Sequence, residues 1–195
     1  MASLISEIPQ SEVNATLELF DRLGVTREGL KNFRKAPSSV QVAVARLMQG
    51  DSNSSSEIVL TIDYGMSLTD MIDAGGYDWT NSDVTAKRFP VSGSGKVEIS
   101  AELVHFDRNI TSDDAVKGMV KRGLRPATFA ELLAFGAKYP EDQRKFPVVA
   151  LGSSAEVHGN LSVPCLYGSD AERSLHLGWC DGGWRGHFRF LAVRN

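Results

Sequence analysis

The stretch from Leu124 to Ser153 constrains the fold most, because it joins a strong helix signal to the signal of a buried strand. Thr128 and Glu131 have the spacing of a capping box, in which each residue satisfies a backbone group of the first helical turn. Gly136 and Pro140 predict the end of this helix. The apolar residues between these limits recur at helical spacing: Phe129, Leu132, Leu133 and Phe135.

After a charged loop at residues 141–145, residues 146–152 form an uninterrupted apolar run that glycine closes. Such a run predicts a short strand covered on both faces, although a short buried helix has the same pattern.

Strand and helix signals also alternate through the rest of residues 57–195. Residues 57–64 predict a strand, residues 67–70 predict the start of a short helix that stops at Gly75, and residues 77–95 look irregular. Residues 96–106 alternate apolar and polar side chains like a half-buried strand, and residues 111–114 start a helix that Gly123 closes. The apolar pieces 161–167, 175–180 and 188–193 predict antiparallel strands joined by glycine loops. This order predicts the α+β class rather than a repeating parallel α/β fold.

The N-terminal 50 residues predict a separate helical unit. Apolar residues recur at helical spacing from Ser11 to Gly24, from Thr26 to Phe33 and from Pro37 to Gly50. The polar segment 51–56 predicts a flexible linker and places a domain boundary between residues 1–50 and residues 57–195. Since three short helices bury little core alone, we expect this unit to serve self-association into a homo-oligomer.

Composition narrows the classes of partner. The 195 residues are 42% hydrophobic, enough for a real core, and carry a net charge of −3. No basic surface is indicated, so nucleic acid is not an expected partner. The N-terminus lacks a secretion-signal pattern, and no apolar run reaches the ~18 residues of a membrane span, so we expect a cytoplasmic protein with no membrane partner. The two cysteines, Cys165 and Cys180, are expected to be small core residues.

Two short motifs resemble one branch of the C-type lectin fold. Residues 123–132, GLRPATFAEL, are similar to the arginine-leucine-proline-threonine helix entry of formylglycine-generating enzymes and retroelement-diversified binding proteins. Residues 186–194, GHFRFLAVR, are similar to the terminal glycine-phenylalanine-arginine strand of that branch. The chain also resembles a group of small bacterial proteins that share the helix entry and a valine-alanine-leucine-glycine-serine strand, from which no activity follows.

The resemblance implies a C-type-lectin-like domain whose C-terminal loops form a ligand surface. Calcium-dependent lectins carry glutamate-proline-asparagine and tryptophan-asparagine-aspartate motifs that this sequence lacks. Formylglycine-generating enzymes hold copper with two closely spaced cysteines, whereas Cys165 and Cys180 are fifteen residues apart. We therefore expect no metal and no cofactor.

The best candidate site is the glycine-rich segment at residues 179–187 near the C-terminus. Rigid aromatic and adaptable polar side chains gather there, as in binding hot spots. The sequence predicts a non-catalytic binding module for a protein or small ligand, with these contact residues: Trp179, Asp181, Trp184, Arg185, His187 and Arg189. The alternative is that both tryptophans are core residues and that residues 181–183 only form a hairpin turn.

Two enzymatic hypotheses stay open beside the binding module. His105 and Asp107 lie on one face of a strand end and could bind a divalent metal or transfer protons, or the histidine could simply be hydrogen-bonded in its loop. Cys180 could form a thiolate pair with His187 across the predicted hairpin, although His176 lies too far along one extended strand. A third hypothesis is a structural subunit of an assembly.

Overall fold

The computed structural model describes residues 26–34 and 58–194. The helices predicted at 11–24 and 37–50 and the linker at 51–56 lie outside these residues. The helix predicted to restart at Thr26 is confirmed as α2 (Arg27–Arg34), and the Thr26 hydroxyl accepts the Gly29 N–H at 3.0 Å. By its internal contacts the chain divides into two compact units, Met1–Ser54 and Ser55–Asn195.

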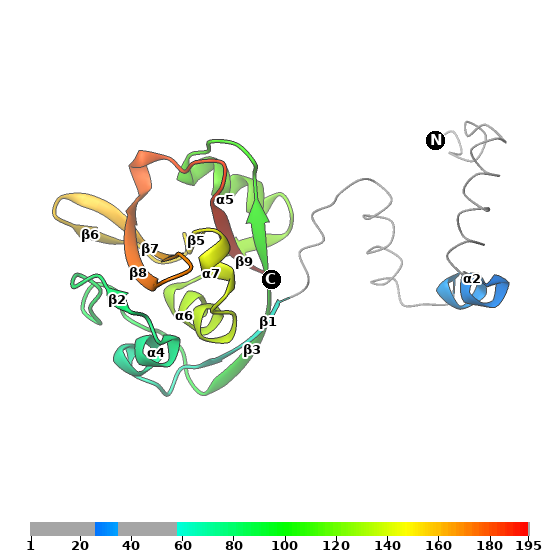
Figure 1. Ribbon diagram of the computed structural model, residues 1–195, viewed down its shortest axis with the longest axis horizontal. Helices are drawn as coiled ribbons and strands as arrows, with labels where there is room; N and C mark the ends of the chain where they lie inside the picture. Colours follow the sequence, from blue (N-terminus) through cyan, green and yellow to red (C-terminus); the bar gives the residue numbers. More distant parts are fainter. Residues whose placement is uncertain (1–25, 35–57, 195) are drawn as a thin grey trace. The chain divides into compact units, whose positions relative to one another are not determined.

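The second unit is built on one mixed sheet, which comprises nine strands in the described residues (Figure 1). The main strand order is β1-β3-β9-β5-β7-β8-β2, while β4 also pairs with β9 and β6 with β7. Pairing is parallel between β5 and β9 and between β2 and β8, and antiparallel elsewhere. In chain order the strands are β1 (Ile58–Asp63), β2 (Trp79–Thr80), β3 (Lys96–His105), β4 (Leu124–Pro126), β5 (Val148–Val149), β6 (Ala155–Val157), β7 (Asn160–Gly168), β8 (Arg173–Trp179) and β9 (Arg189–Arg194).

Helices pack on both faces of this sheet. Because its strands pair mainly antiparallel, the unit is α+β, as predicted. On the first face, α4 (Leu68–Gly75) and α6 (Phe129–Lys138) bury apolar side chains against the strands. The short helix α7 (Asp142–Lys145) follows α6, and α5 (Ser112–Val120) packs on the second face. Neighbouring strand residues therefore enter different cores: Phe190 lies in the core under α5, and Leu191 lies in the core under α4 and α6.

The local signals place most helix ends correctly. The capping boxes predicted at Ser67 and Thr128 are present, and α5 begins after Thr111, whose hydroxyl accepts the Asp114 N–H at 3.2 Å. In the capping box at Thr128, the hydrogen bond to the glutamate side chain is the stronger of the two interactions, since the Thr128 N–H donates to Glu131 Oε2 at 2.7 Å. Thr128 Oγ1 faces the N3 amide but makes no hydrogen bond of standard geometry within the described chain.

Three details of the prediction are wrong. Helix α6 ends at Lys138, between Gly136 and Pro140 as predicted, but residues 142–145 are helical rather than a loop. The segment 77–95 contains the two-residue strand β2. In β3 the face that carries Val97 is expected to be buried, but Val97 is 40% exposed at the start of the strand, whereas Val104 on the opposite face is buried under α5.

The last strands also pair differently from the prediction. Strands β7 and β8 form the expected antiparallel hairpin, but β9 pairs with β3, β4 and β5. Since β5 and β7 lie between β9 and β8, the segment 180–188 is a crossover along the end of the sheet and not a hairpin turn. Its first residues form the 3-10 turn η2 (Cys180–Gly182).

Candidate functional site

The predicted C-terminal loop lies beside the loop that joins β3 to α5. We call residues 105–112 and 179–188 together the loop pair. Ile110 and Trp184 exchange two backbone hydrogen bonds, of 2.9 and 2.8 Å. The Gly186 N–H donates to Asn109 Oδ1 at 3.2 Å. Two segments about seventy residues apart in the sequence thus form one hydrogen-bonded surface.

Trp184 is the buried anchor of the loop pair, so its predicted role as a ligand contact is wrong. Its side chain is 4% exposed, and its indole N–H donates to Ser112 Oγ at 2.9 Å. The Ser112 hydroxyl in turn donates to the Cys180 carbonyl at 2.8 Å. A Cβ at Gly178 would lie 2.7 Å from the Trp184 ring, so the ring packs directly on the β8 backbone. The alternative assignment to the core is correct for this tryptophan.

Trp179 has the opposite environment, because its side chain is 65% exposed at the end of β8. Asp181, Arg185 and His187, which follow it, are exposed as well. Exposed tryptophan and arginine side chains on a fixed backbone are the residue types that dominate binding hot spots. Trp179 therefore remains available as a contact residue, as the sequence predicts.

Between the two loops lies a polar groove of about 440 Å³. Arg108 and Arg185 are among its lining residues, and their guanidinium groups make no hydrogen bond or ion pair with any other residue that the structure describes. Sequence analysis singled out Arg185 but missed Arg108, since a lone arginine after β3 carries no pattern. The full lining is Arg108, Asn109, Ile110, Thr111, Asp114, Gly182, Gly183, Trp184 and Arg185.

Arg189 is partly withdrawn from this surface. It is the first residue of β9, and its guanidinium lies 4.7 Å from the centre of the Phe146 ring, a cation–π contact. Its Nη1 donates to the His187 carbonyl at 3.0 Å. Burial lowers the pKa of Arg189 from its usual value, against the attraction of Asp107. Arg189 thus fixes the end of the loop, while the His187 ring stays exposed beside Phe188.

His105, at the end of β3, is hydrogen-bonded to residues 179–188, which agrees with the alternative prediction that this histidine has a structural role in its loop. Its Nε2 lies 2.7 Å from the Gly186 carbonyl, so this nitrogen carries a proton and donates. Asp107 Oδ1 lies 3.7 Å from the same atom. In the described ranges, no three histidine, cysteine, aspartate or glutamate side chains are placed to hold a metal ion. The geometry around His105 therefore assigns it to positioning the loop.

The cysteines lack the features of thiolate nucleophiles. Burial raises the pKa of the Cys180 thiol, and the hydrogen bond from Ser112 offsets this only in part. Burial also raises the pKa of Cys165, which lies inside the second core. The hairpin expected to bring His187 to Cys180 does not form, because β9 and β8 are not neighbours.

An aromatic row on the second face extends from the loop pair to the edge of the sheet, and sequence analysis missed it. Ring centroids lie 4.4 Å apart for Trp79 and His176, 5.1 Å for His176 and Tyr167, and 6.0 Å for Tyr167 and Phe188. Burial lowers the pKa of His176, against the attraction of Glu172, and raises the pKa of Tyr167 to about 12. Trp79 joins the row through two residues of parallel pairing with β8, which is too short to leave a sequence signal.

No protein-family model, curated protein or solved structure matches this chain. The helices in the described part of the chain are all too short or too polar to cross a lipid bilayer. The fold and the site define the class: an α+β unit with a mixed sheet, whose C-terminal crossover and β3–α5 loop present an exposed tryptophan and two arginines without an ion-pair partner in the described residues.

Proposed function

We propose that residues 57–195 are a C-type-lectin-like binding module that recognises a protein partner through the loop pair. The observation that carries this proposal is that hydrogen bonds fix the backbone of the two loops while one tryptophan side chain is left exposed. Trp184, Ser112, His105 and Asn109 hold the two loops by hydrogen bonds, while Trp179 projects outward. Pre-organised loops with exposed aromatic anchors bind with a small loss of conformational entropy.

The charge pattern favours a protein over a small anion. Arg108 and Arg185 line the groove together with Asp114, and the exposed Asp107 and Asp181 belong to the same two loops, so the surface carries both signs. A mixed polar rim around an aromatic contact is typical of protein interfaces. Electrostatic complementarity of this kind selects the partner and its orientation more than it adds affinity.

The arrangement of residues 96–194 supports the lectin-like part of the proposal. Within this segment the first strand, β3, and the last strand, β9, are antiparallel neighbours, and both α5 and α6 lie between them in the chain. The two motifs that carry the resemblance form the start of α6 and strand β9.

The test is site-specific photo-crosslinking in cells that express the full chain. A photoreactive phenylalanine replaces Trp179 in one variant and Val120, which is 59% exposed on α5, in the control. We expect a discrete adduct from position 179 only. Binding of the purified partner is then measured for Trp179→Ala and for the double variant Arg108→Ala, Arg185→Ala.

A hot-spot tryptophan predicts that Trp179→Ala weakens the affinity by about thirtyfold, which corresponds to a loss of ~2 kcal/mol. All three side chains are on the surface, so the variants should unfold at the wild-type urea concentration. Equal affinities for the wild type and both variants would refute the proposed surface.

A further inference from the structure

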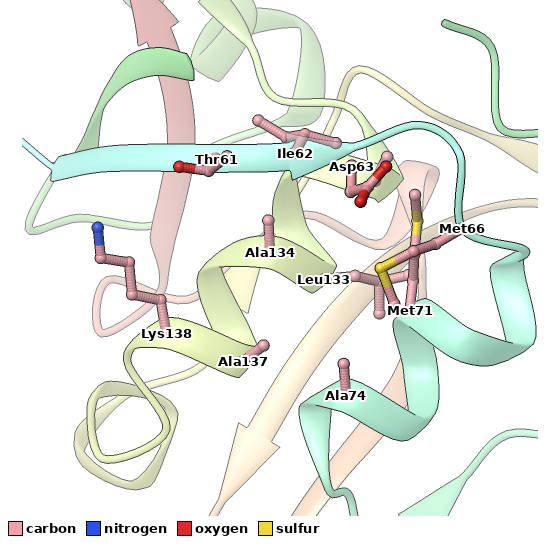
Figure 2. A pocket seen from close by; sticks show the side chains of 11 residues that line it. Thr61, Ile62, Asp63, Met66, Met71, Ala74, Leu133, Ala134, Ala137 and Lys138 are labelled. Carbon is pink, nitrogen blue, oxygen red and sulfur yellow. The ribbon is translucent and has the colours of Figure 1, made fainter. Parts of the chain in front are cut away.

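A second concave site lies on the first face of the sheet, away from the loop pair. Strand β1, helix α4 and helix α6 enclose an apolar groove of about 430 Å³, which we call the α4–α6 groove (Figure 2). This volume is within the range of small-molecule sites. Its lining is Thr61, Ile62, Asp63, Met66, Met71, Ala74, Ala130, Leu133, Ala134, Ala137 and Lys138.

The groove exists because the facing helix surfaces carry small side chains. On α6 the lining residues recur at intervals of three and four, so they form one face of the helix, and three of them are alanines. Ala74 provides the same small surface on α4. At the deeper side Leu133 and Met71 are buried, and the partly buried Met66 closes one end. Methionine side chains adapt to apolar ligands of different shape.

The polar groups of the groove lie at its ends. Figure 2 shows Lys138 and Thr61 toward one end and Asp63, beside Met66, toward the other. Asp63 is already occupied: Oδ1 accepts the Gly65 N–H at 3.0 Å, and Oδ2 lies 3.4 Å from Lys96 Nζ. The two ends therefore differ in charge.

At the other end of the groove, the positive charge of Lys138 is not neutralised by a carboxylate of the described residues. Its ammonium group donates one hydrogen bond, of 2.7 Å, to the Val59 carbonyl on β1, the first strand in the order of the described sheet. It makes no ion pair with any carboxylate in residues 26–34 or 58–194. An ammonium group has three donors, so two remain for a ligand.

From this charge distribution we propose that the α4–α6 groove binds an aliphatic monocarboxylic acid of medium chain length. The carboxylate lies at Lys138, with the Thr61 hydroxyl as a second donor. The hydrocarbon chain lies along Ala134, Leu133 and Met71, where burial of each methylene group contributes favourably. At the far end the lining side chains, Asp63, Met66 and Met71, offer no hydrogen-bond donor to a second acidic group, so the site selects monoacids over diacids of the same length.

The test uses decanoate as the probe, below its micelle concentration, with the full chain carrying ¹³C-labelled methionine methyl groups. Decanoate should shift the Met66 and Met71 methyl resonances in a saturable manner. Decanol lacks the carboxylate and decanedioate has one at each end, so both should bind more weakly than decanoate. Lys138→Met should weaken decanoate binding by about fivefold, as expected for the loss of one exposed ion pair, and should leave decanol binding unchanged.

Two variants show whether the groove itself is the site. Ala137→Glu places a carboxylate at an exposed helical position that tolerates it, and should abolish decanoate binding with the fold intact. Val120→Glu on the exposed surface of α5 is the matched control and should bind decanoate like the wild type. Unshifted methionine methyls, equal affinity for decanoate and decanol, or unchanged binding by Ala137→Glu would each overturn the proposal. None of these variants touches the loop pair, so the two proposed sites can fail independently.

Discussion

At the scale of single residues, the Arg173 side chain joins strand β8 to three helices, α4, α6 and α7. It is 7% exposed on β8, and its guanidinium donates to the carbonyls of Gly75 and Gly136, both at 2.7 Å. A third bond, of 3.0 Å, reaches Oε1 of Gln143 on α7. The two carbonyls lie in the last turns of α4 and α6, where backbone acceptors lack partners within the helix and the helix dipole is negative. One cation thus joins two helix ends to the sheet.

We expect Arg173→Met to lower the free energy of unfolding by about 3 kcal/mol, because it leaves buried carbonyls without donors. The measurement is urea unfolding followed by circular dichroism, with the slope compared between variants. Arg173→Lys keeps the charge but cannot form three divergent bonds, so it should fall between the wild type and Arg173→Met. A loss below about 1 kcal/mol in Arg173→Met would show that water replaces the guanidinium.

Tyr77 provides a matched control in the same place. Its ring lies 5.2 Å from the Arg173 guanidinium, but its hydroxyl is buried and makes no hydrogen bond to any described residue. Burial raises the pKa of this phenol well above its usual value. Tyr77→Phe keeps the cation–π contact and removes an unsatisfied group, so stability should stay equal or rise. The opposite responses of these two neighbours would separate loss of specific bonds from general disturbance of the core.

At the scale of elements, the entry to α6 is held by an ion pair between the buried Glu131 and the partly exposed Arg125. Glu131 is almost fully buried and accepts two hydrogen bonds from Arg125, of 2.9 and 2.6 Å, and one from the Thr128 N–H. The next amide, of Phe129, donates to Ser153 Oγ at 2.9 Å, which joins the helix start to the segment after β5. Burial acts to raise the pKa of Glu131, but the bonds from Arg125 and Thr128 outweigh it, so the pKa is lowered.

This lowered pKa predicts the direction of the pH dependence. A carboxyl group whose pKa is lower in the folded state contributes its full stability above its unfolded pKa, about 4.3 for glutamate, and loses it as the pH falls through the folded value. Glu131→Gln should therefore lower the free energy of unfolding by ~2 kcal/mol at pH 7, as for hydrogen bonds to a charged group. The difference between variant and wild type should shrink steadily below pH 4.

Urea unfolding at a series of pH values from 7 to 3 measures this difference. The control Glu156→Gln changes an exposed glutamate on β6 and should follow the wild-type curve. A constant difference between Glu131→Gln and the wild type at every pH would mean that the charge of Glu131 is not what stabilises the helix entry.

The sequence predicted elements whose signals are local and missed relationships that depend on distant segments. The helix starts at Ser67, Thr111 and Thr128 follow from side chains within three residues of the cap. The pairing of β9 with β3 and β5 instead of β8 cannot be read locally, because strand partners are chosen by packing on both faces.

The candidate site shows the same limit. The glycine-rich segment with two tryptophans was identified, and Trp179 is exposed. Trp184 is buried only because Gly178 on β8 and Ser112 on α5 receive its ring and its N–H, and these residues are far from each other in sequence. Arg108 lines the groove from the loop after β3, and Trp79 on β2 connects to Phe188 through His176 and Tyr167; neither residue has a sequence pattern around it.

At the scale of the whole molecule, the middle of the sheet is covered on both faces, and Cys165 lies there on β7, which pairs with β5 and β8. Its thiol is inaccessible and donates to the Val163 carbonyl at 3.6 Å. Burial raises the pKa of both thiols, and the half-buried Cys180 lies in the loop pair outside the sheet. Thiol modification can therefore report two different opening motions of one molecule.

With a disulfide reagent at pH 7.5, we expect Cys180 to react more slowly than a free thiol, and Cys165 to react only when the sheet unfolds globally. In Cys180→Ser, which isolates Cys165, the logarithm of the rate should rise linearly with urea, with the slope of global unfolding. Adding Arg173→Met should speed Cys165 modification by about a hundredfold, since 1.4 kcal/mol is a factor of ten in an equilibrium. Fast modification of Cys165 without urea would contradict this, because it would mean that β7 and β8 separate while α4, α6 and the rest of the sheet stay folded.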